Sequence, residues 1–324
     1  MTSLGYAVSD HFDGERFFNS TGARGAPFSK VLRMLREKRT PWPRDLEVRQ
    51  RRPPARTQDS GTLITFVGHS TFVVQLDGCT VLTDPMYGRR AGPLNLLGPA
   101  RRREPGVAFG DLPHIDVVLL SHNHYDHCDT VTLRRVQRMH APLFITPLGN
   151  GRLLRRIGAT RIEELDWWQT ASFGASAFTA VPAQHFSART PFDRNRALWS
   201  GFVIRNGNER VYFAGDTGYM PLFGEIAQRA GPIDVALLPI GAYEPRWFMK
   251  DIHMNPAEAV QAHIELGARK SIACHFGTFQ LTLEGVDEPA TRLREALADR
   301  GIGAGRFVVP AEGGTERVRE RVNG

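Results

Sequence analysis

Residues 117–127 read VVLLSHNHYDH, an apolar run followed at once by a tract of side chains that bind metals. Residues i and i+2 of an extended segment face the same way, so His122 and His124 can bind one ion. Imidazole suits zinc and a carboxylate adds charge compensation, and Asp126 and His127 can turn toward a second ion. The alternative, a polar surface loop with chance histidines, fits poorly with a position directly after a buried strand.

Three other apolar runs end in the same kind of side chain. His185 follows residues 178–181, Asp216 follows 211–214, and His275 follows 271–274. Strand ends in a packed sheet lie near one another, so we expect these residues to converge on the 121–127 tract. Asp216 is the natural bridge between two cations. Taken alone, each of these histidines would more often be structural.

The bulk composition is that of a globular protein. The chain has 324 residues, of which 41% are hydrophobic and 23% charged, and no stretch has the length and apolar character of a membrane span. The first 18 residues lack an apolar signal core, so we expect no classical export. Three sparse cysteines favour a reducing compartment, and we expect a cytoplasmic protein. The net charge of +7 suits phosphate-bearing partners but equally suits a solvated basic face.

The chain divides into an N-terminal arm, residues 1–58, that packs on the body, and a hydrolase body, residues 59–324. The sequence of the arm predicts one short basic helix over 29–39, with Val31, Leu32 and Leu35 on one side. In the body, strands are predicted at 63–66, 72–76, 79–82, 117–120, 143–146, 176–181, 201–205, 210–214, 234–238 and 271–274, and helices at 130–139, 150–157 and 256–266. Asn255, Pro256 and Glu258 form the start signal of the last helix. Interleaved strands and helices indicate an α/β or α+β class.

Several motifs, in order along about residues 60–300, closely resemble the N-acylphosphatidylethanolamine-hydrolysing phospholipase D family and its bacterial relatives within the metallo-β-lactamase superfamily. They lie at 68–71, 82–85, 121–127, 165–168, 213–219, 239–250, 253–260 and 275–279. The resemblance implies an α+β fold, a four-layer αβ/βα sandwich with two zinc ions per chain at one edge. Iron or manganese could occupy similar ligands.

The resemblance also implies a role for each matching residue. His122, His124 and His185 would hold the first zinc, and Asp126, His127 and His275 the second, with Asp216 bridging. His253 would line the site, and Asp84 would orient a ligating histidine by a hydrogen bond.

We therefore expect metal-assisted hydrolysis of a phosphodiester, with Asp126, Asp216 and His253 in the catalytic set. An N-acylphosphatidylethanolamine or a related phospholipid would give an N-acylethanolamine and phosphatidic acid. Three alternatives stay open: hydrolysis of a small lactone, ester or other phosphodiester, a nuclease, and a metal-binding regulator. Apolar and basic walls around the site would favour lipid, and a small closed pocket would favour a small ester. No nucleic acid is expected, because the chain has no room for the large inserted domain of RNA-processing relatives.

Other residues carry open alternatives. Tyr125 and Tyr243 could contact substrate, or their rings could pack under the site. His69 could support the metal ligands or be a buried, hydrogen-bonded histidine, and Trp247 and Phe248 could line an apolar entrance or simply pack. The remaining histidines are expected at the surface or in caps: His11, His114, His140 and His263. Peripheral membrane contact and a homodimer stay open.

Overall fold

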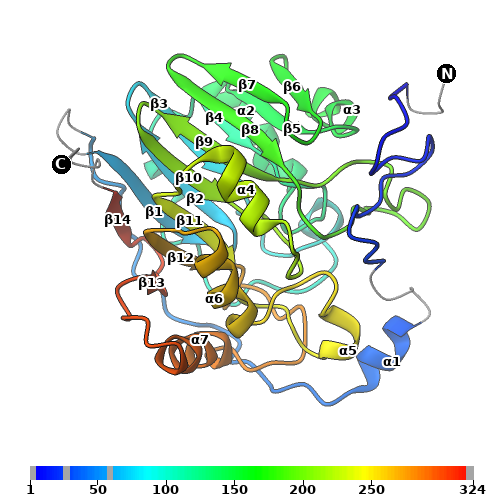
Figure 1. Cartoon of the computed structure of the whole chain (residues 1–324), viewed down its shortest axis with the longest axis vertical. Helices are drawn as coiled ribbons and strands as arrows, with labels where there is room; N and C mark the ends of the chain where they lie inside the picture. Colours follow the sequence, from blue (N-terminus) through cyan, green and yellow to red (C-terminus); the bar gives the residue numbers. More distant parts are fainter. Residues whose placement is uncertain (1–4, 25–29, 57–60, 319–324) are drawn as a thin grey trace.

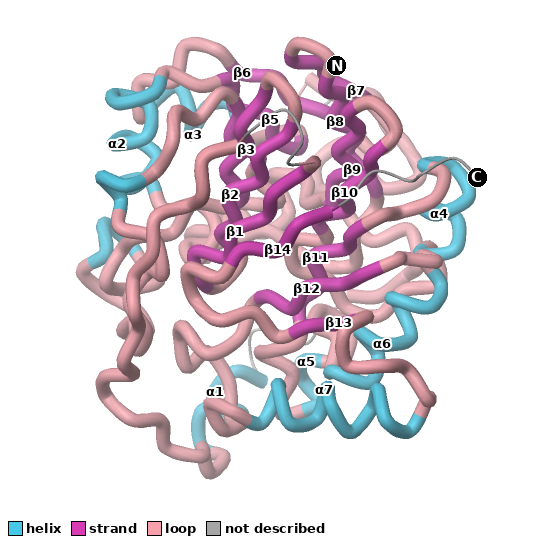
Figure 2. The backbone as a smooth tube through the Cα atoms, turned by 90° about the vertical axis from the view of Figure 1, so that its left-hand side faces the viewer, coloured by secondary structure: helices cyan, strands magenta, loops and turns pink. Residues whose placement is uncertain are grey.

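The computed structural model describes residues 5–24, 30–56 and 61–318. Two seven-stranded sheets lie face to face, with helices on their outer faces (Figures 1 and 2). In Figure 2, α2 (Thr130–His140) and α3 (Gly151–Arg156) lie beside one sheet and α4 (Phe223–Ala230) and α6 (Pro256–Glu265) beside the other. The predicted αβ/βα four-layer sandwich is confirmed.

The first sheet is formed mainly by the N-terminal half of the body. Its strands are, in spatial order, β14 (Thr315–Val318), β1 (Thr62–Gly68), β2 (Thr71–Leu76), β3 (Cys79–Thr83), β4 (Val117–Leu119), β5 (Leu143–Pro147) and β6 (Ile162–Leu165). Neighbours from β14 to β3 are antiparallel, and neighbours from β3 to β6 are parallel.

The second sheet repeats this mixed arrangement with the C-terminal half. Its strands are, in spatial order, β13 (Phe307–Val308), β12 (Lys270–Cys274), β11 (Val235–Pro239), β10 (Glu209–Phe213), β9 (Gly201–Asn206), β8 (Ser176–Val181) and β7 (Thr170–Phe173). Neighbours from β13 to β10 are parallel, and neighbours from β10 to β7 are antiparallel. The remaining elements are α1 (Val31–Arg36), α5 (Arg246–Met249), α7 (Glu288–Asp299) and the 3-10 turns η3 (Pro93–Asn95) and η4 (Phe109–Asp111).

The alternation of side chains along each strand explains the continuous apolar run at residues 117–120. Val117 and Leu119 face the core between the sheets, whereas Val118 and Leu120 face the layer beneath α2 and α3. A strand buried on both faces has no polar alternation to display. Its side chains stay out of water until the chain leaves the sheet, which is where the polar tract begins.

The N-terminal arm contacts the body in two places. Phe12 and Phe17 pack against Trp167 and Trp199 in a small apolar cluster. Further along, α1 lies beside α5 (Figure 1), and Met34 and Met249 belong to one small buried apolar cluster. The predicted helix at 29–39 is confirmed in its central part, while residues 25–29 and the side chains of Leu32 and Leu35 lie outside the described residues. The domain boundary at residue 58 stays a prediction.

The prediction of a position at the surface or in a cap is wrong for two histidines. His11 is buried, stacks on Trp167 and forms hydrogen bonds with Asp166 (2.7 Å) and Asp10. His263 is also buried and lies 2.8 Å from the Ser271 hydroxyl. Asp166 is 155 positions from His11 and leaves no local pattern, and the contact of His263 joins α6 to β12 without any motif that marks it. Within the described residues, no helix has the length and apolar character needed to cross a membrane.

Candidate metal centre and active site

The topology places every candidate ligand at one edge of the sandwich. Because β2 and β9 run opposite to their neighbours, strands β1, β3 and β4 point the same way in the first sheet, as do β8, β10 and β12 in the second. The residues that follow them are His69 after β1, Asp84 after β3, and the 121–127 tract after β4, together with His185, Asp216 and His275 in the second sheet. Ligands converge where strands of like direction end.

Three imidazoles form one corner of the cluster. His122 Nε2 lies 2.8 Å from His124 Nδ1, and His185 Nε2 lies 3.2 Å from that same atom. All three side chains could offer one nitrogen to a common ion. Burial lowers the pKa of His124 to about 3 and that of His185 to about 4. The rings are therefore neutral at pH 7, and each has a lone pair to give to a metal.

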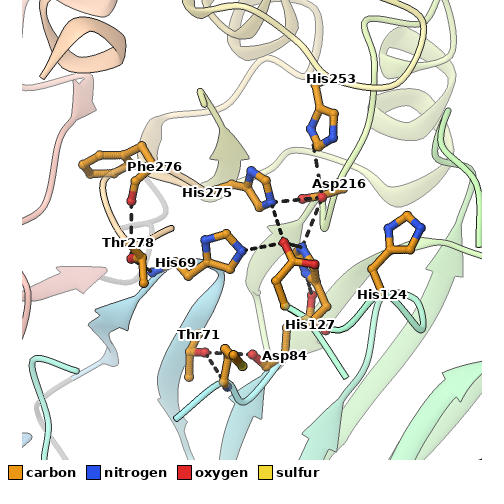
Figure 3. Close-up of polar contacts among 12 residues, drawn as sticks. His69, Thr71, Asp84, His124, His127, Asp216, His253, His275, Phe276 and Thr278 are labelled. Carbon is orange, nitrogen blue, oxygen red and sulfur yellow. Dashed lines mark hydrogen bonds and ion pairs between the residues drawn. The ribbon is translucent and has the colours of Figure 1, made fainter. Parts of the chain in front are cut away.

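Asp216 joins this corner to a second group. Its Oδ2 lies 3.1 Å from Nε2 of both His127 and His275 (Figure 3). The same oxygen lies 3.9 Å from His185 Nε2. Asp126 Oδ2 lies 3.5 Å and 3.4 Å from the same two nitrogens. The carboxylate of Asp216 therefore faces both groups of imidazoles, which is the position that a bridging ligand requires.

The two carboxylates of this second group, Asp126 and Asp216, need positive charge beside them. Burial alone would raise the pKa of Asp216, but His127 and His275 beside it hold that pKa well below 3.8. Burial alone would lower the pKa of His275, but Asp216 and Asp126 raise it to about 9. Without a metal, protons on these imidazoles balance the two buried carboxylates. A divalent cation can replace those protons, since metal binding releases protons from its ligands.

Unpaired atoms also fit a metal. Asp216 Oδ1 is buried without a hydrogen-bond partner in the described structure, and His127 Nε2 faces only the carboxylates of Asp216 and Asp126, at 3.1 and 3.5 Å. Buried polar atoms normally have a partner, so such atoms in a cluster of imidazoles and carboxylates indicate a bound ion. The donor set, nitrogen and carboxylate oxygen, is one that zinc accepts and that iron or manganese can share.

Asp84 holds two of the ligands from behind. Its Oδ2 accepts a hydrogen bond from His127 Nδ1 (2.7 Å) and another from the Ser121 hydroxyl (2.6 Å), while its Oδ1 accepts from the Ser121 amide. The Ser121 oxygen lies 2.9 Å from His122 Nδ1. Asp84 is fully buried, and burial raises its pKa. It fixes the ring of His127 directly and that of His122 through Ser121.

His69 and His253 complete the polar contacts. His69 is buried, and its Nε2 donates to Asp126 Oδ2 at 2.9 Å, so it is both a hydrogen-bonded histidine and a neighbour of the candidate ligands. His253 points at Asp216 from the far side, with Nδ1 4.0 Å from Oδ2 (Figure 3). Arg246 Nη1 donates to the His253 carbonyl, and Arg246 Nη2 lies within hydrogen-bond distance of both carboxylate oxygens of Glu258. Glu258 also completes the predicted capping box of α6, which is confirmed.

A pocket of about 580 Å³ opens beside His124. Its lining residues are Val31, His124, Phe186, Ala188, Arg189, Thr190, Pro191, Arg194, Phe248 and Ile252. Phe186 lies between His124 and Arg194, with the His124 ring and the Arg194 guanidinium each 4.4 Å from the Phe186 ring. The walls are therefore mostly apolar, with two cationic side chains.

The two tyrosines lie at different places. The Tyr125 hydroxyl donates to the carbonyl of Arg189, whose guanidinium stacks on the Tyr125 ring at 4.0 Å, so Tyr125 supports the pocket wall. Tyr243 is buried and lines a separate cavity with Asn255 and Glu288. Phe248 lines the main pocket, whereas Trp247 is 38% exposed and stacks beneath Arg33 of α1.

Some residues that shape the site could not be found from sequence. Asn19 in the arm forms two hydrogen bonds with the backbone of His185 (3.0 and 3.1 Å). Arg189 and Arg194 come from a loop whose sequence carries no motif. Arg246 lies inside the 239–250 stretch, so family resemblance gives its position but only the structure gives its partners.

Comparison with known proteins agrees with this geometry. Residues 80–276 match the model of the beta-lactamase superfamily domain. The chain is 39% identical over 254 residues to N-acyl-phosphatidylethanolamine-hydrolyzing phospholipase D 1 of Caenorhabditis elegans, covering 75% of this chain and 71% of that protein. It is 36% identical to N-acyl-phosphatidylethanolamine-hydrolyzing phospholipase D, mitochondrial, of Saccharomyces cerevisiae, covering 78% of this chain and 55% of the yeast protein.

Solved structures share the fold at lower identity. A metallo hydrolase from Ignicoccus hospitalis, Igni18, superposes with a TM-score of 0.60 at 22% identity, covering 80% of this chain and 99% of that one. An isothiocyanate hydrolase from Delia radicum gut bacteria gives a TM-score of 0.62 at 23% identity, covering 78% and 98%.

Proposed function

Because the chain belongs to the beta-lactamase superfamily, and within it to the family of the N-acyl-phosphatidylethanolamine-hydrolyzing phospholipases D, we propose that it is a two-zinc phosphodiesterase of the phospholipase D type. Its substrate is an N-acylphosphatidylethanolamine or a related phospholipid. The products are an N-acylethanolamine and phosphatidic acid. A cytoplasmic location is part of this proposal, supported by three free, buried cysteines, while a homodimer stays a prediction.

The ligand assignment follows the two groups of side chains. His122, His124 and His185 would hold one zinc, Asp126, His127 and His275 would hold the other, and Asp216 would bridge the two groups. When bound, the ions supply Lewis acidity: they lower the pKa of a water molecule and neutralise negative charge that develops on the phosphoryl oxygens. The support is the convergence of these seven side chains at one buried edge.

The chain's own residues position the reacting groups. Asp126 and Asp216 remain ionised at pH 7, so their oxygens can accept hydrogen bonds from the attacking water. In the reaction the water oxygen bonds to phosphorus, the P–O bond to the N-acylethanolamine oxygen breaks, and that leaving oxygen takes up the proton that the water loses. Burial holds the pKa of His253 well below 6.5. Its neutral ring can orient the leaving oxygen through an N–H.

The pocket beside His124 is the observation that carries the substrate assignment. Apolar walls of Phe186, Phe248 and Ile252 suit an acyl chain, and the two arginines suit a phosphodiester anion. A small lactone or ester would leave this volume of apolar wall unfilled and would give the guanidinium groups no anion to bind. The phospholipid therefore fits better than the small-ester alternative.

The test combines metal analysis of the purified protein with release of N-acylethanolamine from N-acylphosphatidylethanolamine micelles. We expect two metal ions per chain, and we expect Asp216→Ala to lose both the metal and the product. Asp251→Ala, which removes an exposed carboxylate near the site, should change neither. Two metals without product would keep the metal centre and move the substrate to a small ester or another phosphodiester, whereas absence of metal would overturn the proposal.

A further inference from the structure

A loop beside the metal-site edge carries three exposed leucines. Within residues 88–100, which we term the leucine loop, Leu94 is 64% exposed, Leu96 is 72% exposed and Leu97 is 66% exposed. Single exposed apolar residues are ordinary, but three within four positions make an apolar patch that usually marks an interaction site.

The loop is built to hold these side chains outward. Its two ends meet where the Ala91 amide donates to the Pro99 carbonyl and the Arg90 guanidinium donates to the Gly98 carbonyl. At this neck, a Cβ on Gly92 would lie 2.1 Å from the Leu97 carbonyl oxygen, so only glycine allows the approach. The Asn95 amide fastens the tip to Asp129. The leucines therefore cannot be buried by a simple collapse of the loop.

The surroundings of the leucine loop are mostly basic, although its tip contacts the buried carboxylate of Asp129. Residues 85–103 contain five arginines and no acidic residue, and Arg89 is exposed. The loop packs on α2, a helix that carries Arg134, Arg135 and Arg138 and no Asp or Glu. An apolar tip within a basic rim complements a bilayer with anionic headgroups, since the leucines can enter the interface while the arginines stay at headgroup level.

The leucine loop also lies next to the substrate pocket. Arg189 of the pocket wall donates to the carbonyl of Cys128, and the next residue, Asp129, accepts the hydrogen bond from Asn95. Pocket wall, α2 start and loop tip are thus linked by consecutive contacts. A surface that rests on the leucine loop would bring the pocket to the lipid.

We propose that the leucine loop docks the protein onto an anionic phospholipid bilayer, an inference that rests on the proposed function. A second copy of the chain is a poorer occupant. Two leucine loops meeting across a two-fold axis would bring the two sets of arginines together, and like charges repel.

The test is flotation of the full chain, loaded with zinc, with two kinds of vesicle that lack N-acylphosphatidylethanolamine. We expect binding to phosphatidylcholine vesicles that contain phosphatidylglycerol and much weaker binding to phosphatidylcholine alone. The triple variant Leu94→Ser, Leu96→Ser, Leu97→Ser should bind at least about tenfold more weakly. Arg89→Gln with Arg138→Gln should weaken binding to the anionic vesicles only. Ile264→Ser, which changes an exposed residue on α6, should bind like the parent protein.

Several outcomes would overturn the inference: no binding by the parent protein, equal binding by the triple variant, or a dimer that the triple variant converts to monomer with vesicle binding unchanged. Metal content and melting temperature of the variants establish that they fold. Hydrolysis of detergent-dispersed substrate by a protein that ignores vesicles would remove the docking surface and keep the proposed function. Vesicle binding without hydrolysis would do the reverse.

Discussion

At the scale of single residues, the carboxylate of Asp84 links two candidate ligands, His127 directly and His122 through Ser121. It accepts hydrogen bonds from His127 Nδ1 and twice from Ser121. Asp84→Asn replaces an acceptor by a donor that faces other donors. We expect metal affinity to fall about tenfold to hundredfold, as is usual when such a supporting group is lost. Competition with a chromophoric chelator measures this, Asp77→Asn at an exposed site is the control, and unchanged affinity would contradict the role.

A second residue, Arg194, is the side chain that our proposal assigns to binding the negative charge of the substrate. Its guanidinium stacks on Phe186 and has no carboxylate partner among the described residues, although the group is half-buried. Arg194→Gln should lower kcat/KM about tenfold to hundredfold for an anionic phosphodiester such as bis(p-nitrophenyl) phosphate. Turnover of a neutral ester should change little. The exposed Arg196 gives the matched control, Arg196→Gln, and an equal loss on both substrates would show a structural effect instead.

The roles of single residues could be predicted from the sequence in some cases and not in others. The 121–127 tract could be assigned to a metal because its chemistry is local: four ligand-type side chains lie within six positions. Arg194 has no such context, because its importance comes from Phe186 and His124, which the fold brings beside it. His11 was misjudged for the same reason, since its partner Asp166 is 155 positions away.

At the scale of elements, the N-terminal arm is tied to the candidate active site. The side chain of Asn19 accepts from the amide of His185 and donates to its carbonyl, and it also accepts from the indole of Trp199. Asn19→Ala leaves these buried groups without partners. We expect about 1–3 kcal/mol less stability, together with lower metal occupancy at His185. Urea unfolding and metal analysis measure the two effects.

The control for that experiment is Glu15→Ala, at an exposed position of the same arm. A loss of stability with full metal occupancy would mean that the arm only braces the fold. Full stability and occupancy in Asn19→Ala would mean that the arm contributes nothing to His185.

Elements were predictable where their pattern is strong and local. The buried strands β2, β4 and β8 lie where short apolar runs indicate them, and the helices α2 and α6 lie where apolar periodicity or caps do. The edge strand β14 was missed because it has four residues and is defined by its pairing with β1, about 250 positions earlier. Helix α7 was also missed: Asp287 makes no side-chain cap there, so the start lacks the signal that α6 has.

At the scale of the whole molecule, the candidate metal centre joins the two sheets. The first sheet contributes the 121–127 tract, and the second contributes His185, Asp216 and His275. Removing the ions should therefore loosen the contact between the halves and lower the melting temperature. A metal at about 1,000 times its Kd adds about 4 kcal/mol. For a protein of this size, that corresponds to a shift on the order of 10 °C.

The size of this shift in melting temperature should depend on pH. The protonation of His127 and His275 determines whether the shift grows or shrinks as pH rises. In the metal-free chain the pKa of His275 is raised to about 9 and that of His127 lies well above 6.5. Below those values each ring holds a proton that the incoming metal must displace, so affinity rises as pH rises toward 9. Calorimetry of zinc-loaded and chelated protein should then show a melting-temperature difference that grows from pH 6 to pH 8.5. A difference that is constant across this range, or absent, would mean that these histidines do not bind the metal.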